Sequence, residues 1–325
     1  MKTRKAVITG GTGFIGTHLS EILIHNSFEV RSLTSNQKIK KDLAVTYWKG
    51  DIRDLDFMRN ACKDADVIFH CAAKGNMTES FTKPFLYHDV NVNGTATVLE
   101  AARLESVKKV IFLSSAMCYG IPDEVPTSES APISPTNPYA TSKVMAERLL
   151  LDWGKYYRIP VVSLRLSLVY GPLMSKTNGT IFSILFPQRL HNLPLTVCND
   201  GNQRRDFVHV QDVCRAALAA FESHADQQVF NIGGGVAHTV NELIRLIGGS
   251  NILRVHDPRA VPDHLELDIT RAKNILRWSP EIDLNQGVQE LLDDIRYWSN
   301  ETPLTPLDLE NRMNDWTDYQ ATPSI

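Results

Sequence analysis

Short apolar runs alternate with amphipathic segments along the first half of the chain. The apolar runs predict buried strands at residues 5–9, 29–33, 45–48, 67–73, 109–115 and 161–166. Apolar residues at helical spacing predict a helix directly after the first strand, and longer helices at about 90–104 and 139–157. This alternation predicts an α/β fold, with a parallel sheet covered by helices on both faces and ligands at the carboxyl ends of its strands.

After Tyr170 the pattern becomes irregular. Helices are predicted at 181–189, 210–223, 240–247 and 286–297, with loops rich in Gly, Pro, Asp and Asn between them. We expect this half to form a smaller lobe that closes over the first. From Glu301 the chain is polar and carries several prolines, which predicts an extended or poorly ordered tail that Trp316 and Tyr319 could anchor.

A glycine-rich turn joins the first strand to the first helix. Residues 10–16 read GGTGFIG, and Gly11, Gly13 and Gly16 fit the pattern G-x-G-x-x-G. Two such glycines allow a tight turn and let backbone N–H groups approach a pyrophosphate, and the third lets the helix lie close to the strand. The helix N-terminus then presents its positive end to phosphates. The position between strand and helix favours a dinucleotide site over a turn without a ligand.

These patterns together predict a Rossmann-type, doubly wound parallel sheet with a smaller C-terminal substrate-binding lobe. The expected division is an NAD(P)-binding domain at 1–170 with strand and helix returns near 204–232, a lobe mainly at 171–300 and a tail at 301–325.

Composition narrows the class of protein. The 325 residues are 43% hydrophobic and 22% charged, with a net charge of −3, so we expect no nucleic-acid partner. Neither a membrane-length apolar run nor a hydrophobic signal core is present. The five cysteines are scattered and lack C-x-x-C spacing, which favours free thiols in a reducing cytoplasm. The histidines form no metal-ligand motif, so we expect no metal.

A tyrosine and a lysine open the predicted helix at 139–157. Tyr139 and Lys143 are four residues apart and therefore share one helix face. An ordinary tyrosine has a pKa of about 10, so its phenolate costs about 4 kcal/mol at pH 7. A neighbouring ammonium offsets much of that cost and makes the phenol a candidate base for alcohol oxidation. Y-x-x-x-K alone is also common on solvated helices.

Ser114 and Ser115 supply a third member, because they end a predicted strand at the ligand-binding edge of the sheet. A hydroxyl there can bond a substrate oxygen or merely satisfy a strand-end backbone group. A functional site is therefore indicated by the three motifs together, since the glycine turn, the serine and Y-x-x-x-K follow one another in this order along the chain.

From these residues the chain resembles the extended short-chain dehydrogenases/reductases, specifically the NAD-dependent nucleotide-sugar epimerase/dehydratase family. The resemblance covers about residues 1–298. Its motifs are GGTGFIG at 10–16, GDIRD at 50–54, HCAA at 70–73, NVNGTATVLEAA at 91–102, SSAMCYG at 114–120, NPYATSK at 137–143, LRLSLVYGP at 164–172, GNQRRDFVHVQDV at 201–213 and NIGGG at 231–235.

The resemblance implies roles for individual residues. Tyr139 would be the base, Lys143 would hold the nicotinamide ribose and lower the tyrosine pKa, and Ser115 would be the catalytic serine. The implied cofactor contacts are Gly10, Gly13, Phe14, Ile15, Gly16, Thr34, Asp51, Ile52, Ala72, Ala73, Lys74, Ser114, Tyr139 and Lys143. The implied substrate contacts are Ser115, Tyr139, Arg205 and Arg259.

Arg205 would clamp the substrate diphosphate, because its planar fork binds phosphate oxygens in pairs. The alternative for Arg205 is an ion pair with Asp206 or another acid. Arg259 would make a second phosphate or ribose contact. The resemblance also implies a homodimer formed through the helices near 90–104 and 139–157.

The chain departs from the family pattern at three points. Thr34 replaces the acid that bonds the adenosine ribose of NAD, and Ser35, Asn36, Lys38, Lys40 and Lys41 follow as donors, so NADP stays an alternative to NAD unless these lysines belong to a solvated loop. Ala116 and Met117 stand where dehydratases and decarboxylases carry acids, which disfavours 4,6-dehydration. Leu168 replaces an asparagine of the R-x-x-N-x-Y-G-P pattern, so one substrate contact is expected to be lost.

The resulting hypothesis is an NAD(P)-dependent epimerase that acts at carbon 4 of a nucleotide-diphosphate sugar through a 4-keto intermediate. The alternative is an NADPH-dependent 4-keto-sugar reductase, which Thr34 favours. A more remote alternative is a non-catalytic cofactor-sensing protein on the same fold. The intact set of Ser115, Tyr139 and Lys143 argues against the last.

Overall fold

A seven-stranded parallel sheet forms the centre of the larger part of the molecule. The structure is a computed structural model that describes residues 3–35, 44–174, 180–249, 251–256, 263–305 and 307–308. Its strands are β1 (Arg4–Thr9), β2 (Phe28–Thr34), β3 (Val45–Lys49), β4 (Val67–His70), β5 (Lys109–Ser115), β6 (Val161–Leu166) and β10 (Gln228–Ile232). Their order is β10-β6-β5-β4-β1-β2-β3. The order reverses between β1 and β4, and the crevice at such a reversal is where doubly wound sheets bind ligands.

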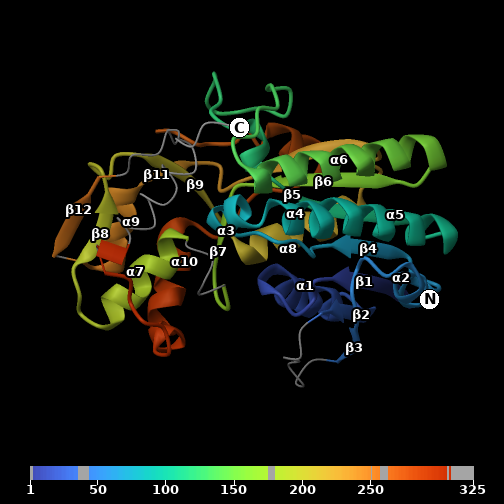
Figure 1. Ribbon diagram of the computed structural model, residues 1–325, viewed down its shortest axis with the longest axis horizontal. Coiled ribbons are helices and arrows are strands. Elements are labelled where there is room, and N and C mark those ends of the chain that lie inside the picture. The colour runs from blue at the N-terminus through green and yellow to red at the C-terminus, as the bar shows by residue number, and fades with distance from the viewer. Residues whose placement is uncertain are drawn as a thin grey trace.

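Helices cover both faces of this sheet (Figure 1). Helices α1 (Phe14–His25) and α8 (Val210–Glu222) cover one face, and α2 (Leu55–Cys62), α5 (Gly94–Leu104) and α6 (Pro138–Tyr157) cover the other. On β1, Ile8 packs in the same core as Leu19 of α1, and Val7 packs in the opposite core with Leu99 of α5. The strands are therefore apolar on both sides, which explains their continuous hydrophobic runs.

The second half builds a lobe beside the carboxyl edge of the sheet (Figure 1). One sheet contains β7 (Leu168–Tyr170), β9 (Arg204–His209) and β11 (Ala237–Thr239), and another contains β8 (Leu195–Cys198) and β12 (Ile252–Val255). The lobe helices are α7 (Ile181–Leu190), α9 (Val240–Ile247), α10 (Leu284–Asp293) and the 3-10 turn η4 (Ile295–Trp298). Their core is aromatic: Tyr170 stacks on Phe182 at 4.9 Å between ring centroids, and Trp298 is fully buried.

Several boundaries differ from the sequence-based expectations. Strand β4 ends at His70 rather than residue 73, and the helix expected from about residue 90 begins with a π-helical turn, η1 (Asp89–Asn93). The helix expected at 286–297 is divided into α10 and η4. The short helices α2, α3 (Met77–Thr82) and α4 (Pro84–His88), the 3-10 turn η2 (Ala116–Tyr119) and the π-helical turn η3 (Ala272–Leu276) were not anticipated. These segments are too short for a helical period to stand out.

Of the expected tail, only 301–305 and 307–308 are described, so Trp316 and Tyr319 lie outside the described residues. Leu304 packs on Val255, as do Ile184 and Cys198, and its carbonyl accepts a hydrogen bond from Gln188 Nε2 at 2.9 Å. This contact ties the chain after η4 back to the lobe.

Candidate active site

The glycine turn brings β1, α1 and the end of β4 into close contact. Gly10 has φ +67°, and a Cβ on it would lie 2.9 Å from the Ala72 Cα. A Cβ on Gly16 would lie 2.4 Å from the Gly10 carbonyl oxygen. In the part of the chain that is described, no side chain caps the N-terminus of α1, which begins at Phe14 after Gly13. The turn therefore leaves a backbone cradle and free helix N–H groups beside Phe14 and Ile15, as a pyrophosphate site needs.

The loop after β4 is hydrogen-bonded to α6 through Asn91, a residue that the sequence analysis did not single out. Asn91 Oδ1 accepts a hydrogen bond from the Lys74 N–H at 2.8 Å, and Asn91 Nδ2 donates to the Lys74 carbonyl at 3.0 Å and to Ser142 Oγ at 2.8 Å. Asn91 thus fixes the loop that carries Ala72 and Ala73. The available signal was its place in the NVNGT motif, where no single residue had been singled out.

The far end of the crevice contains Thr34 and Asp51. The Thr34 and Thr12 hydroxyl oxygens are 2.6 Å apart and share a hydrogen bond. Asp51 accepts hydrogen bonds from the Arg53 side chain, which lower the pKa of that carboxyl. Ile52 is buried under Gly94. The expected donors Asn36, Lys38, Lys40 and Lys41 lie outside the described residues.

Ser115 and Tyr139 meet at the carboxyl end of β5, and Lys143 follows Tyr139 by one turn of α6. Tyr139 lies in the first turn of α6, which Asn137 caps by accepting a hydrogen bond from the Ala140 N–H at 2.9 Å. Burial raises the pKa of Tyr139, and hydrogen bonding with the Ser115 side chain opposes this rise by favouring the phenolate. The structure therefore brings the expected base and serine into direct contact.

The Lys143 side chain is buried against β5. Its Nζ donates to the Leu113 carbonyl at 2.6 Å and lies 4.1 Å from the Phe112 ring centroid. Burial lowers the pKa of Lys143 to about 7, against the attraction of Glu147. Lys143 and Tyr139 are one helical turn apart on α6, and a positive charge at Lys143 would favour loss of the phenol proton.

Ser114 and Ser115 play different structural parts. Ser115 Oγ accepts a hydrogen bond from the Met117 N–H at 3.2 Å and so caps the turn η2. The Ser114 hydroxyl is buried, and among the described residues it has no hydrogen-bond partner. Buried hydroxyls normally have one, so Ser114 is consistent with a site that a ligand completes. Ala116 and Met117 follow within η2, so no acid stands there.

Arg205 lies on β9 in the lobe, directly opposite His238 of β11. Its Nη1 donates to the Arg204 carbonyl at 2.8 Å. The neighbouring Asp206 is buried and accepts hydrogen bonds from the backbone N–H groups of Gly234 at 2.5 Å and Leu267 at 3.1 Å, while burial raises its pKa to about 6. The Asp206 carboxyl is thus engaged by backbone groups.

Two further positions, Arg259 and Leu168, were expected to bear on substrate binding. Arg259 lies outside the described residues. Leu168 opens β7 and pairs with Phe207. An apolar side chain therefore occupies the position where the family pattern has an amide.

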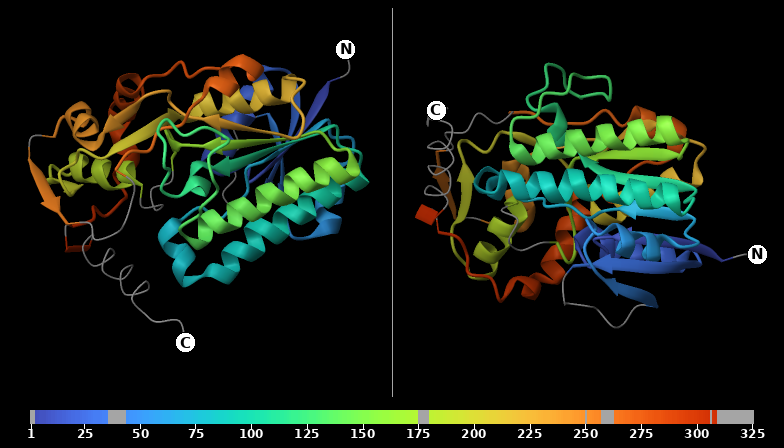
Figure 2. Two further views of the ribbon diagram at one scale, coloured as in Figure 1. Left: turned by 90° about the horizontal axis from the view of Figure 1, so that it is seen from above. Right: turned by 45° about the vertical axis from the view of Figure 1, so that its right-hand side comes forward.

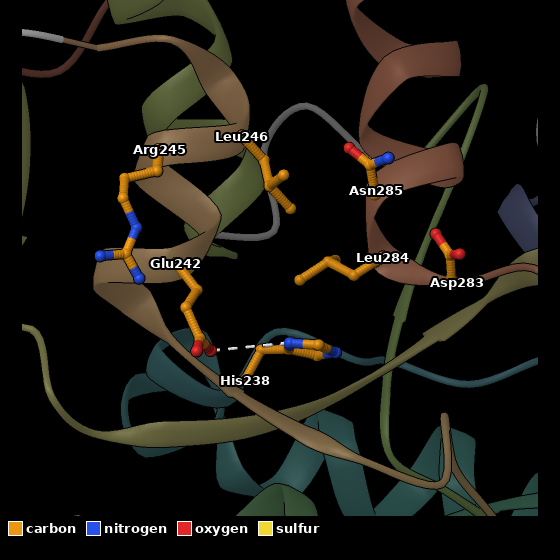
Figure 3. A pocket seen from close by; sticks show the side chains of 7 residues that line it. All are labelled: His238, Glu242, Arg245, Leu246, Asp283, Leu284 and Asn285. Carbon is orange, nitrogen blue, oxygen red and sulfur yellow. Dashed lines mark ion pairs between the residues drawn. The ribbon is translucent and has the colours of Figure 1, made fainter.

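A hollow of about 400 Å³ lies between α9 and α10 (Figure 3). Figure 3 shows Leu246 and Leu284 facing the gap between the helices. Its lining residues are His238, Glu242, Arg245, Leu246, Asp283, Leu284 and Asn285. None of the predicted site residues lines this hollow.

Comparison with known proteins identifies the family. A model of the NAD dependent epimerase/dehydratase family matches residues 6–233. The chain belongs to this family. One relative from Methanocaldococcus jannaschii, provisionally named a UDP-glucose 4-epimerase, is 36% identical over 298 residues, which are 88% of this chain and 97% of the relative.

Solved structures of the family share the fold. The UDP-glucose 4-epimerase of Thermotoga maritima, solved with UDP-glucose, aligns with a TM-score of 0.85 and 30% identity over 90% of this chain and 99% of that one. The UDP-glucuronic acid 4-epimerase of Bacillus cereus, in complex with UDP-glucuronic acid and NAD, aligns with a TM-score of 0.83 and 30% identity over the same shares. The Rossmann-type fold expected from the sequence is confirmed.

The described residues also bear on membrane spans and metal sites. None of their helices is both long and apolar enough to cross a bilayer. Within the same residues, no three His, Cys, Asp or Glu side chains converge as metal ligands would.

Proposed function

We propose that the protein is an NAD-dependent epimerase that inverts carbon 4 of a UDP-hexose through a 4-keto intermediate. The observation that carries this proposal is the contact of Tyr139 with Ser115 at the carboxyl end of β5, with Lys143 one turn further along α6. Related proteins of similar length are 4-epimerases of UDP-sugars, which supports the choice of nucleotide and of carbon.

The crevice between β1 and β4 fits a dinucleotide. The Gly10 and Gly16 cradle, the uncapped N-terminus of α1 and the unpartnered Ser114 hydroxyl are each what such a ligand would use. The residues that would hold it are Gly10, Gly13, Phe14, Ile15, Gly16, Thr34, Asp51, Ile52, Ala72, Ala73, Lys74, Ser114, Tyr139 and Lys143. NAD supplies a reversible hydride acceptor when it is bound.

The chain's own residues supply the proton chemistry and the binding. Tyr139 takes the proton of the 4-hydroxyl, and Ser115 orients that oxygen by hydrogen bonding. Lys143 stabilises the Tyr139 phenolate by its charge. Arg205 and Arg259 hold the diphosphate, so that the sugar can turn while the nucleotide stays bound. Binding energy from the distant nucleotide thereby retains a labile keto sugar.

A second candidate function is an NADPH-dependent 4-keto-sugar reductase. The observation that favours it is Thr34, which places no carboxylate against a 2′-phosphate. Dehydration is disfavoured, because Ala116 and Met117 cannot exchange protons.

We also propose a homodimer formed through α5 and α6, which lie side by side on the outside of the molecule (Figure 2). Apolar side chains on and next to these helices remain accessible, including Leu104, Met145, Tyr156 and Tyr157. Light scattering on Met145→Asp should then show a monomer. A cytoplasmic location would suit the five cysteines, all of which are free thiols.

The deciding experiment mixes the enzyme with catalytic NAD and UDP-, GDP-, dTDP- or CDP-hexoses, and follows the sugars by NMR. We expect interconversion of carbon-4 epimers without a change of absorbance at 340 nm. If no hexose is converted, and a 4-keto-6-deoxy sugar is reduced with oxidation of one NADPH per sugar, the reductase function replaces the proposed epimerase function.

A further inference from the structure

A chain of buried polar side chains lies behind the catalytic group. The Glu147 carboxylate accepts hydrogen bonds from Arg165 Nη2 at 2.6 Å and Nε at 3.1 Å, and from Ser163 Oγ at 2.7 Å. Arg165 Nη1 donates to the Tyr119 hydroxyl at 2.9 Å, and this hydroxyl donates to Asn231 Oδ1 at 2.7 Å. Glu147, Arg165, Tyr119 and Asn231, which we call the buried network, are each at most 6% exposed.

The buried network touches the catalytic group at two places. Glu147 follows Lys143 by one helical turn on the same face of α6. Tyr119 closes the turn η2, which Ser115 opens and caps. The network therefore connects the helix that carries Tyr139 and Lys143 to the turn that carries Ser115.

Stability alone does not explain this arrangement. A buried ion pair is costly to desolvate, and replacing it by apolar residues of similar volume is often neutral or stabilising. The polar groups of the buried network satisfy one another, and such satisfied networks hold their members in one geometry. Its position against Ser115 and Lys143 indicates what this geometry serves.

The groups around Lys143 differ in charge. At the end of β4, burial and the Lys143 charge lower the pKa of His70 to about 3, and burial raises the pKa of Cys71 to about 12. Both are therefore neutral near pH 7, and so is the buried Tyr139 phenol, whose pKa is raised. Among the described groups that act on Lys143, Glu147 is the anion that favours its charged form.

We propose that Glu147, Arg165 and Tyr119 are positioning residues for the proposed epimerase reaction, on which this inference rests. Arg165 and Tyr119 hold the Ser115 turn against α6. Glu147 anchors Arg165 and gives the buried Lys143 a negative neighbour that keeps it an ammonium.

The test of the charge uses the NAD holoenzyme with the double variant Glu147→Gln/Arg165→Met, which removes both members of the Glu147–Arg165 ion pair together. The Tyr139 phenolate is titrated near 295 nm, as the difference between each protein and its Tyr139→Phe counterpart. The positive nicotinamide ring of bound NAD would lower the pKa of Tyr139 towards the range in which Lys143 is charged, so loss of Glu147 should raise the midpoint by about one pH unit. A matched control removes the Arg59–Glu105 pair, which joins α2 to the end of α5, with Arg59→Met/Glu105→Gln and should not move the midpoint.

Two milder variants keep the inference testable if the double variant does not fold. Glu147→Asp withdraws the carboxylate by one methylene, so the midpoint should rise by a smaller amount. Tyr119→Phe keeps both charges but cuts the link to Asn231, so kcat should fall several-fold with unchanged KM and an unchanged midpoint. An unmoved midpoint in the Glu147 variants overturns the charge role, and a wild-type kcat in Tyr119→Phe overturns the positioning of Ser115.

The titration uses no sugar, so it separates the two proposals. If no hexose is epimerised but the midpoint rises, the proposed function fails and the charge role of Glu147 stands. If epimers interconvert and neither the midpoint nor kcat changes in the variants, only the present inference fails.

Discussion

The two ends of the proposed cofactor crevice are held in different ways. At the reacting end, Ser115 and Lys143 are buried, and their partners come from β5 and α6. At the adenosine end, the side chains of Asp51 and Arg53 are 44% and 38% exposed and pair with each other across a turn. The comparison teaches that the reacting end is built from buried groups, whereas the adenosine end combines a buried hydroxyl, Thr34, with a half-exposed pair of charges at Asp51 and Arg53.

The largest expected effect comes from removing the base at the reacting end. Tyr139→Phe should retain the fold and NAD binding, because the phenyl ring remains, but kcat should fall by about 100-fold or more, the usual contribution of a positioned base. Turnover is followed by NMR of the epimers, and folding by circular dichroism.

Tyr157→Phe is the matched control, since it makes the same change at the exposed end of α6 and should leave kcat unaltered. A Tyr139→Phe enzyme that keeps more than about a tenth of wild-type turnover would place the base elsewhere.

A second prediction extends the comparison to the lobe. Arg205→Ala should weaken UDP binding by about 1.5–3 kcal/mol, the range for hydrogen bonds to charged groups. Titration calorimetry with UDP measures the loss. Arg245→Ala removes the same charge from the same lobe, but at the hollow between α9 and α10, and should leave the affinity unchanged. Equal affinities of wild type and Arg205→Ala would remove Arg205 from the site.

A third prediction concerns the reduction in the free energy of unfolding that burial of Lys143 causes at the reacting end. Burial lowers the pKa of Lys143 to about 7, whereas an unfolded lysine titrates at about 10.4. Between these values the unfolded chain binds more protons, so the free energy of unfolding rises with pH. Lys143→Met should reduce that rise by up to about 1.4 kcal/mol per pH unit.

Urea unfolding at pH 7, 8 and 9 without added cofactor measures this slope. Loss of the bond to the Leu113 carbonyl shifts the whole curve of the variant but not its slope. If the free energy of unfolding changes with pH in the same way in wild type and Lys143→Met, burial does not lower the pKa of Lys143.

What could be predicted from the sequence depended on whether a residue's role can be read from its local pattern or only from partners far away in the sequence. Tyr139, Lys143 and Ser115 were predicted because Y-x-x-x-K opens a long helix and the serine ends a long buried strand, and both elements can be read from the sequence. Asn91, Arg165 and Glu147 were missed as site residues, because their partners are distant in sequence: Asn91 bonds Ser142, and Arg165 bonds Tyr119. Such pairs exist only after the sheet is assembled.

The lobe was the least predictable part of the fold. Its helices were expected, but the three-residue strands β7 and β11 carry no readable alternation. Their positions depend on pairing with β9, and hence on tertiary contacts. Arg205 was therefore located from its motif, whereas its neighbour His238 on β11 could not be foreseen.

The smallest expected effect lies at the adenosine end, where we expect the protein to accept NADP as well as NAD. Thr34 Oγ1 bonds Thr12 Oγ1, and a carboxylate at this position would repel a 2′-phosphate while bonding the ribose hydroxyls of NAD. Thr34→Asp should therefore shift the preference towards NAD by about 1 kcal/mol, the scale of one hydrogen bond. Dissociation constants for NAD and NADP, measured by calorimetry, give the preference. Thr34→Val loses the bond to Thr12 without adding charge and should leave the preference as in wild type. If wild type and Thr34→Asp reject NADP equally, another residue reads the 2′ position, and the adenosine end is as constrained as the reacting end.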